Sequence, residues 1–301
     1  MDNKKVKGYA YGVIASVSYG LNPLFALPLY ASGIRVDSVL FYRYVFALLF
    51  LAVMMKMSGQ SFALKRNEIL PVAVMGLLFS FSSLFLFQSF NYMDAGIAST
   101  ILFMYPVLVA VIMAVFFKER LSVVKIASIA TAFVGISMLY KGEGGATLSM
   151  TGVCLVLMSS LTYALYIVGV NRSSLKEMPG LKLTFYAMLV YIVRLRGGMD
   201  LQWLTEGTQW MNALGLALFP SLISMVTIAK AIRNIGATPA AILGALEPLT
   251  ALFVGVMVFH ERLTGGNVVG ILLILFAVTL IVVGPRGWLR FKAVWHKRTV
   301  G

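Results

Sequence analysis

The sequence predicts an all-α polytopic membrane protein, with ten transmembrane helices arranged as two inverted five-helix repeats. Three observations support this prediction: an extreme apolar composition, a succession of apolar runs, and an internal repeat that also inverts the distribution of charge. The chain has 301 residues, of which 60% are hydrophobic and 12% charged, and its mean hydropathy is +0.90. Soluble domains average ~45–50% apolar and about 25% charged residues. The composition therefore excludes soluble, disordered and collagen-like classes, and the single cysteine excludes an internal disulfide.

Nine apolar runs are long enough, or nearly so, to cross the ~30 Å hydrocarbon core, which takes about 20 residues. In chain order they are Tyr9–Tyr30, Val39–Met57, Ile69–Phe90, Ala95–Phe117, Val123–Tyr140, Met150–Val170, Trp210–Ile228, Pro239–Phe259 and Val268–Val283. We expect the first run to be a retained helix, because it is too long for a signal peptide. The loops between the runs are mostly short, so no soluble domain is expected within the chain.

A tenth run, Leu183–Val193, is short and is bracketed by Lys182 and Arg194. At helical rise it covers only about 16 Å. Snorkelling of the flanking cations and local thinning of the bilayer would allow it to cross. If it did not cross, the two repeats would not be inverted. The internal repeat and the charge distribution both favour crossing.

The formal net charge of +14 is distributed unevenly across the predicted membrane. Nineteen of the 25 Lys and Arg residues fall on the side of the N-terminus, five fall on the opposite side, and Arg43 falls within a span. The positive-inside rule then places both termini in the cytoplasm. The excess of positive charge is therefore an orientation signal, and we expect no nucleic-acid partner.

An internal repeat relates the two halves of the chain. Ser16–Tyr19 is similar to Ser160–Tyr163 at an offset of 144 residues, and Glu119–Ser122 is similar to Glu261–Thr264 at an offset of 142. Five spans per repeat, an odd number, invert the second copy in the membrane. Inverted repeats are common in secondary transporters, which bind substrate near the bilayer midplane between the two halves.

Several segments of this repeat resemble the EamA family of the drug/metabolite transporter superfamily. They are Phe90–Ser99, Tyr105-Pro106 and Lys118–Ser122 in the first half, and Leu246–Pro248 and His260–Thr264 in the second. The resemblance covers nearly the whole chain as two tandem units, 1–143 and 144–301. It implies ten helices, a central cavity, alternating access and, frequently, the export of amino acids or other small metabolites.

Glu247 is the only carboxylate deep within a predicted span. An ionised group at that depth costs several kcal/mol and normally faces a cavity or a partner. One interpretation is a contact for a substrate amine or a protonatable coupling site. The other is a structural acid beside the helix break at Pro248, and family members often carry Glu-Pro here. Its counterpart in the first repeat is Tyr105, so the shared fold does not require the acid.

Two further candidates lie in the first two spans. Arg43 is positioned to hold an anionic group such as a substrate carboxylate, and the alternative is a long side chain that snorkels to the outer interface. Asn22-Pro23 and Pro28 interrupt the first helix. Such a break exposes backbone groups to a substrate or is a simple kink.

Matching polar positions across the repeat complete the set of candidates. Ser82 matches Ser224, and Tyr19 matches Tyr163. For the serines, hydrogen bonding between helices is the favoured interpretation, at only ~0.6 kcal/mol on average. For Tyr105 and Tyr163 we expect a place in the lining of the cavity.

The predicted function is that of a secondary transporter for small organic metabolites, most directly an amino-acid or metabolite exporter, in the cytoplasmic (inner) membrane. Its expected partners are the substrate and the bilayer, and its expected state is a monomer or homodimer. The alternative is a channel or a lipid translocase on the same scaffold. We expect no cofactor, no metal and no catalysis, since the sequence has no phosphate-binding loop, no metal-ligand motif and no paired carboxylates.

Overall fold

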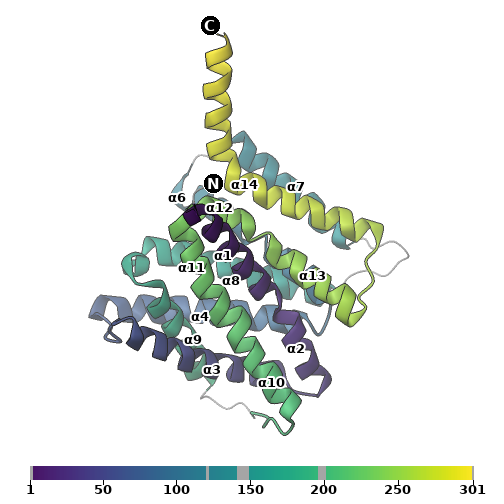
Figure 1. Ribbon diagram of the computed structural model, residues 1–301. Helices are drawn as coiled ribbons and strands as arrows, with labels where there is room; N and C mark the ends of the chain where they lie inside the picture. The colour runs from purple at the N-terminus through teal and green to yellow at the C-terminus, as the bar shows by residue number, and fades with distance from the viewer. Residues whose placement is uncertain (1–2, 120–121, 141–148, 196–200, 300–301) are drawn as a thin grey trace.

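The computed structural model describes residues 3–119, 122–140, 149–195 and 201–299, and every regular element in these ranges is helical (Figure 1). The first half comprises α1 (Asn3–Gly20), α2 (Asn22–Ala31), α3 (Val36–Met57), α4 (Arg66–Ser89), α5 (Ala95–Leu102), α6 (Tyr105–Phe117) and α7 (Val123–Tyr140). The second comprises α8 (Met150–Arg172), η1 (Ser174–Glu177), α9 (Gly180–Leu195), α10 (Gly207–Leu216), η2 (Ala217–Ile223), α11 (Ser224–Ile235), α12 (Ala237–Leu243), α13 (Leu246–Phe259) and α14 (Gly265–Thr299). The expected boundary at 143/144 and the residues Arg120, Lys141 and Arg196 lie outside the described residues.

Within the described ranges, eight helical segments are long and apolar enough to span a membrane. They are Asn3–Ala31, Val36–Met57, Arg66–Ser89, Ala95–Phe117, Met150–Arg172, Gly207–Ile235, Pro239–Phe259 and Gly265–Val282. Two further helices, Val123–Leu139 and Gly180–Val193, are apolar but shorter. The protein is therefore an integral membrane protein, and eight of the ten predicted spans meet the length and hydropathy of a membrane helix. The doubtful seventh run is longer than predicted, since α9 begins at Gly180 and has 16 residues.

Proline does not break the first span at every position that the sequence suggested. Leu21 separates α1 from α2, and Pro23 lies in the first turn of α2, where its missing N–H costs nothing. Pro28 lies inside α2 without ending it, so the expectation of a second break there was wrong. The structure therefore has a single break in this span, at Leu21, between α1 and α2.

The two halves repeat an unusual backbone feature. Lys118 and His260 end α6 and α13, and they are the non-glycine residues with positive φ in the described ranges, at 54° and 57°. The next residue folds back in the same way in each copy: Glu119 N–H donates to Met113 O at 3.1 Å, and Glu261 N–H donates to Gly255 O at 3.0 Å. Both positions differ by the 142 residues expected from the sequence repeat.

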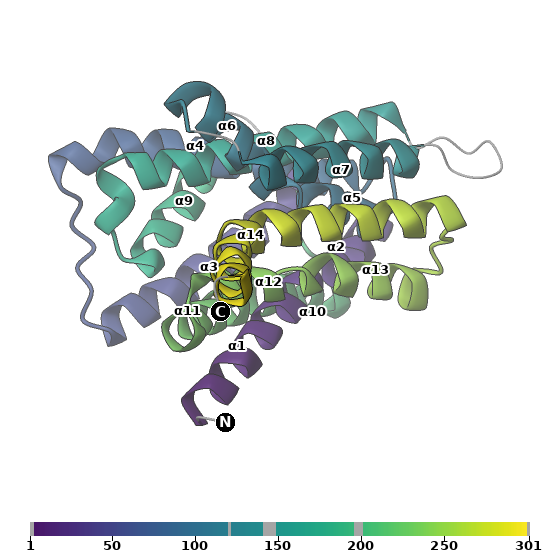
Figure 2. The same cartoon turned by 90° about the horizontal axis from the view of Figure 1, so that it is seen from above.

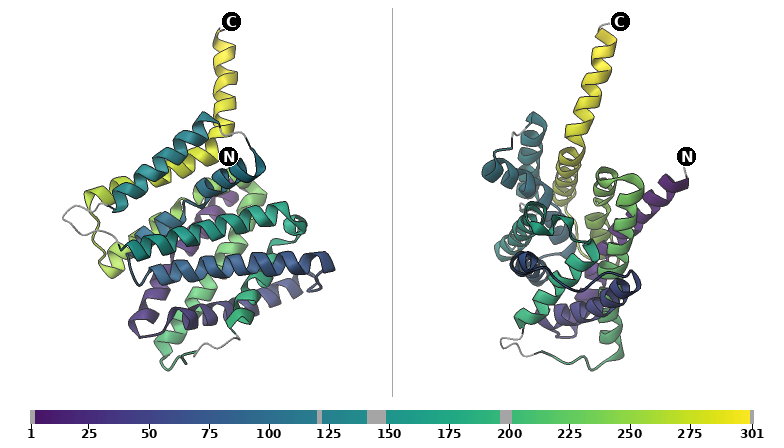
Figure 3. Two further views of the ribbon diagram at one scale, coloured as in Figure 1. Left: turned by 180° about the vertical axis from the view of Figure 1, so that it is seen from behind. Right: turned by 90° about the vertical axis from the view of Figure 1, so that its left-hand side faces the viewer.

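The helices pack as two layers with a shared edge. Figure 2 shows α4, α6, α7 and α8 on one side and α1, α11, α12 and α13 on the other. The edge is formed by α7 and α14, which run side by side in Figure 3. Close approach of α1 to α13 requires Gly20, where a Cβ would lie 2.5 Å from the carbonyl oxygen of Glu247. This approach brings α1 and α2 to the break that precedes α13, at the centre of the bundle.

Candidate functional site

A cavity of about 730 Å³ lies at the centre of the bundle, between the two halves of the chain. This volume falls within the ~300–1,000 Å³ typical of sites for small molecules. Eight polar or charged residues that the sequence singled out line it: Tyr19, Asn22, Arg43, Ser82, Tyr105, Tyr163, Ser224 and Glu247. The structure therefore brings the candidates together in one place, and their role in transport stays a prediction.

Arg43 is held in the lining of this cavity by a distortion of the eighth predicted span. Pro220 lacks a backbone N–H, and the chain around it widens into a π-helical turn, η2, as happens frequently at functional sites. The turn presents the buried Ser221 to Arg43, whose Nε donates to Ser221 Oγ at 3.1 Å. The guanidinium also lies 5.2 Å from the Phe87 ring and 5.6 Å from the Tyr44 ring.

The contacts of Arg43 argue against one of the two interpretations of its role. Its side chain is only 5% exposed, so it does not snorkel to an interface. Within the described part of the chain, the ion pair formed is Lys125–Glu119, so Arg43 has no carboxylate within 4 Å. A buried cation that contacts only neutral groups bears a desolvation cost without a compensating anion. An anionic ligand group would supply that anion.

Glu247 lies in the first turn of α13, directly after the break at Gly244 and Ala245, and not in the middle of a continuous helix. A carboxylate is favourable there, because the N-terminus of a helix carries partial positive charge. This partly supports the structural interpretation. Its carboxylate nevertheless lines the cavity, and it accepts no hydrogen bond from the described residues. The acid is therefore open to a cationic ligand group.

Tyr19 lies between the two charges. Its hydroxyl interacts electrostatically with both Arg43 and Glu247, and Arg43 also hydrogen-bonds it. Arg43 and Glu247 do not form an ion pair with each other. The cavity thus presents one basic and one acidic side chain that share Tyr19 as a neighbour and do not pair with each other.

Asn22 supplies an unpartnered polar atom to the same space. Its Nδ2 donates to the carbonyl oxygen of Tyr19 at 2.8 Å, which fixes the orientation of the side chain. Its Oδ1 is buried and accepts no hydrogen bond from the described residues. A buried acceptor without a donor costs ~1–3 kcal/mol, so this atom is well placed to accept from a ligand.

An aromatic wall closes one side of the cavity. The rings of Tyr105 and Tyr163 meet edge to face with centroids 4.8 Å apart, and Tyr166 stacks on Tyr163 at 5.9 Å. Tyr105 occupies in α6 the position that Glu247 occupies in α13. The expectation that both tyrosines line the cavity agrees with this geometry.

The two serines behave differently although they match in the repeat. Ser159 Oγ donates to the Ser82 carbonyl oxygen at 2.6 Å, and the two hydroxyls lie 3.3 Å apart, so Ser82 joins α4 to α8. Ser224 also lines the cavity, at the start of α11. Hydrogen bonding between helices is thus the observed role of Ser82.

Sequence reasoning missed Ser221, Asn171 and Thr184, which also line the cavity. Pro220 was a signal for the first, but prolines recur in several spans and did not single out this one. Asn171 lies at the end of α8, and the lining continues there to Ile232 of α11 and Ala240 of α12. The cavity therefore extends towards the end of the bundle from which α1 begins.

This fold and cavity define a class: an integral membrane protein whose two related halves enclose a mainly apolar cavity with a few polar side chains in its lining. No group of three or more metal-ligating side chains occurs among the residues that could be searched.

Comparison with known proteins gives the family. The model of the EamA-like transporter family matches residues 6–141 and 150–283. The chain is 24% identical over 226 residues to the uncharacterized transporter YvbV of Bacillus subtilis (strain 168), covering 72% of this chain and 73% of YvbV. It is 23% identical over 286 residues to the uncharacterized transporter YcbK of the same organism, covering 90% and 91%. One solved crystal structure superposes with a TM-score of 0.64 over 94% of this chain and 99% of the other, at 16% identity, which shows the fold alone.

The chain belongs to the EamA-like transporter family, and the resemblance inferred from its motifs is confirmed. A general role in transport follows from the family and from these relatives.

Proposed function

We propose that the protein is a secondary carrier that exports small zwitterionic metabolites, amino acids foremost, across the cytoplasmic membrane by alternating access. The observation that carries this proposal is that one basic and one acidic side chain, Arg43 and Glu247, line a single cavity of about 730 Å³ without pairing with each other. A free amino acid carries one carboxylate and one ammonium group, and each would pair with one of these side chains. Asn22 Oδ1 is a further acceptor for the ammonium group.

The topology that accompanies this proposal has ten spans. The shorter α7 and α9 also cross, the termini are cytoplasmic, and residues 1–143 and 144–301 form two repeats of opposite orientation. The equivalent left-handed turns at Lys118 and His260 support the repeat. With this orientation, the cavity lining that reaches Asn171, Ile232 and Ala240 extends towards the cytoplasm. The conformation is then inward-facing, as an exporter would be when it collects its substrate.

The test is exchange of labelled amino acids in proteoliposomes that contain the purified protein. We expect saturable counterflow, with a strong loss of exchange in Arg43→Ala and in Glu247→Gln. Ser137→Ala is a matched control, because the exposed Ser137 of α7 bonds only its own helix, at Phe133 O. Exchange unaffected by both cavity variants would overturn the assignment of the site.

The same preparation separates the carrier from the alternatives. A channel would give single-channel currents in a planar bilayer, far above the turnover of a carrier. A lipid translocase would move a labelled phospholipid between leaflets. Either result without amino-acid exchange would overturn the proposed function.

A further inference from the structure

A contact between the two halves lies at the end of the bundle opposite to the end towards which the cavity extends. Oε1 of Glu261, just after α13, accepts a hydrogen bond from the backbone N–H of Ala95 at 3.0 Å. Ala95 is the first residue of α5, and Asp94, its N-cap residue, makes no side-chain capping bond. Glu261 therefore caps α5 from the other half of the chain, 166 residues away.

Two glycines make room for the Glu261 carboxylate. A Cβ on Gly255 would overlap Glu261 Oε2. A Cβ on Gly96 would lie 2.8 Å from Leu252 Cα and 3.3 Å from Glu261 Oε2. The left-handed turn at His260 and the bond from Glu261 N–H to Gly255 O direct the side chain back into this space. The glycine seat, as we call Gly96 and Gly255, thus allows α5 and α13 to pack closely with the carboxylate between them.

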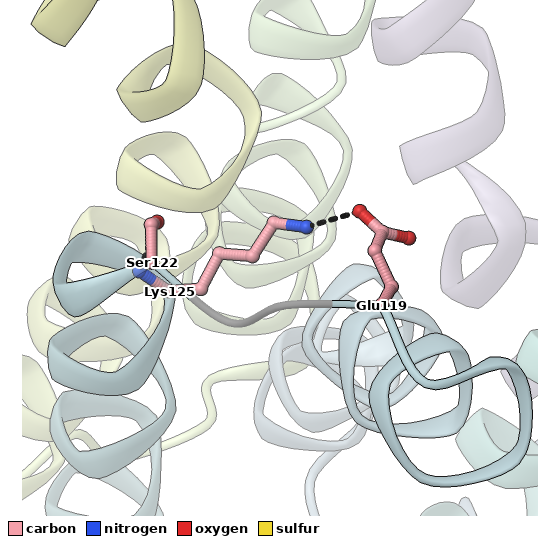
Figure 4. Close-up of polar contacts among 3 residues, drawn as sticks. All are labelled: Glu119, Ser122 and Lys125. Carbon is pink, nitrogen blue, oxygen red and sulfur yellow. Dashed lines mark hydrogen bonds and ion pairs between the residues drawn. The ribbon is translucent and has the colours of Figure 1, made fainter.

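The opposite end of the bundle, which the internal repeat relates to the Glu261 end, lacks these features. Glu119 follows the same left-handed turn. The repeat equivalent of Gly255 is Met113 and that of Gly96 is Thr238, so neither position of the seat is a glycine there. Glu119 Oε1 instead pairs with Lys125 Nζ of its own half at 2.7 Å (Figure 4). Among the described residues, α6 and α12 show no packing comparable to that of α13 on α5. One end of the cavity is fastened, and the other has neither the seat nor the contact.

We propose that Glu261 is a latch that holds the Ala95 end of the cavity closed, and that the latch responds to protons because its carboxyl group is partly buried beside Asp94. The proposal rests on the proposed alternating access, because a latch has meaning only if this end also opens. In this proposal the resting conformation is the one that is closed at the Ala95 end, because no equivalent latch holds the other end.

The sensitivity to protons has a physical cause in the surroundings of Glu261. Burial and the nearby Asp94 raise the pKa of Glu261 to about 7, and the bond from Ala95 N–H lowers it only in part. Once the latch opens and the carboxyl meets water, its pKa falls towards its ordinary value of 4.5. Closing therefore takes up a proton, and lower pH favours the closed end. Protonated Glu261 keeps an oxygen that accepts from Ala95 N–H, and it no longer repels Asp94.

The remaining ionisable groups near Glu261 do not change this sign. Among the described residues, Asp94 is the charged group that acts on Glu261, and the chain neighbours His260 and Arg262 are exposed. The final turn of α13 and the segment Gly265–Val282 of α14 contribute none.

The experiment measures access to the cavity from each side. In a Cys154→Ala background, which removes the only native cysteine, Ser99→Cys places a thiol on α5 in the cavity lining. A membrane-impermeant maleimide is then applied separately to the two faces of oriented vesicles. We expect Glu261→Ala to increase labelling from the face of Ala95 roughly tenfold, as for loss of one charge-assisted hydrogen bond. Glu119→Ala, the matched control, should leave that rate unchanged.

Two further variants keep the test decisive. Gly255→Ala retains the carboxylate but fills its seat, and it should label like Glu261→Ala. Glu261→Gln imitates the protonated acid, so it should stay closed and lose the difference between about pH 5.5 and about pH 8.5. Equal labelling of the parent, Glu261→Ala and Gly255→Ala would overturn the latch even if the parent exchanges amino acids. A parent that exchanges nothing and is labelled from one face only, whatever amino acid is added, would overturn the proposed function instead.

Discussion

Replacing Arg43 by Gln removes the one positive charge that lines the cavity in the described structure while it keeps an amide donor near Ser221. Arg43 has only neutral neighbours, with Nε 3.1 Å from Ser221 Oγ and two rings at 5.2 and 5.6 Å. A hydrogen bond to a charged group contributes ~1.5–3 kcal/mol. Loss of the one made with a substrate carboxylate should therefore weaken binding by about tenfold to about 150-fold.

The stability of the protein should change much less than its affinity. The variant loses two cation–π contacts of ~0.5–2 kcal/mol each, and it also relieves the cost of a buried cation without a counter-ion. We expect these effects largely to offset each other in thermal unfolding. Loss of binding and retention of stability together would distinguish a ligand contact from a packing residue.

The assay compares an amino acid with its methyl ester, which keeps the ammonium group and removes the carboxylate charge. Ligand-induced thermal shifts, recorded over a concentration series, give the affinity of each compound. The parent protein should prefer the amino acid, and Arg43→Gln should bind both compounds about equally. A variant that still prefers the amino acid by the same factor would refute the pairing of Arg43 with the carboxylate.

Three further outcomes are expected. Glu247→Gln should weaken binding of an amino acid by about tenfold or more and leave an N-acetylated analogue, which has no ammonium group, unaffected in the same thermal-shift series. Burial and Asp94 raise the pKa of Glu261 to about 7, so its contribution to stability is present below about pH 4.5 and is lost as the pH rises through about 7. After allowance for partial exposure, the lost free energy of unfolding is about 1 kcal/mol. We expect a corresponding fall in Tm with rising pH, which Glu261→Gln should abolish. Gly20→Ala should lower the free energy of unfolding by ~1–3 kcal/mol, because its Cβ would lie 2.5 Å from both the Glu247 carbonyl oxygen and Thr250 Cβ; an unchanged Tm would contradict the close packing of α1 on α13.

The sequence predicted the helices well because apolar runs of the required length have few other solutions. It also named Asn22, Tyr105 and Glu247 as candidates for the site, and all three line the cavity. The limits of the runs were less accurate. Lys182 was excluded from the seventh run as a charged residue, yet α9 includes it, because a helix continues through a polar residue near its end.

The features missed are those that depend on contacts between distant segments. The environment of Arg43 follows from the π-helical turn at Pro220 and from the Ser221 hydroxyl, 178 residues away. The bond between Glu261 and Ala95 links different halves, and its glycine seat is visible only once α5 and α13 are packed together. Hydropathy and spacing report which residues avoid water, and they carry no information on which faces of two helices meet.

Counterflow of a labelled amino acid into proteoliposomes tests the central claim most directly. The account predicts saturable exchange that unlabelled zwitterions inhibit and that neither an amino-acid ester nor an N-acetylated analogue inhibits to the same extent. It also predicts loss of exchange in Arg43→Gln and in Glu247→Gln. Exchange that proceeds equally well with both analogues, or with both charges removed, would contradict a cavity that recognises its substrate through one positive and one negative group.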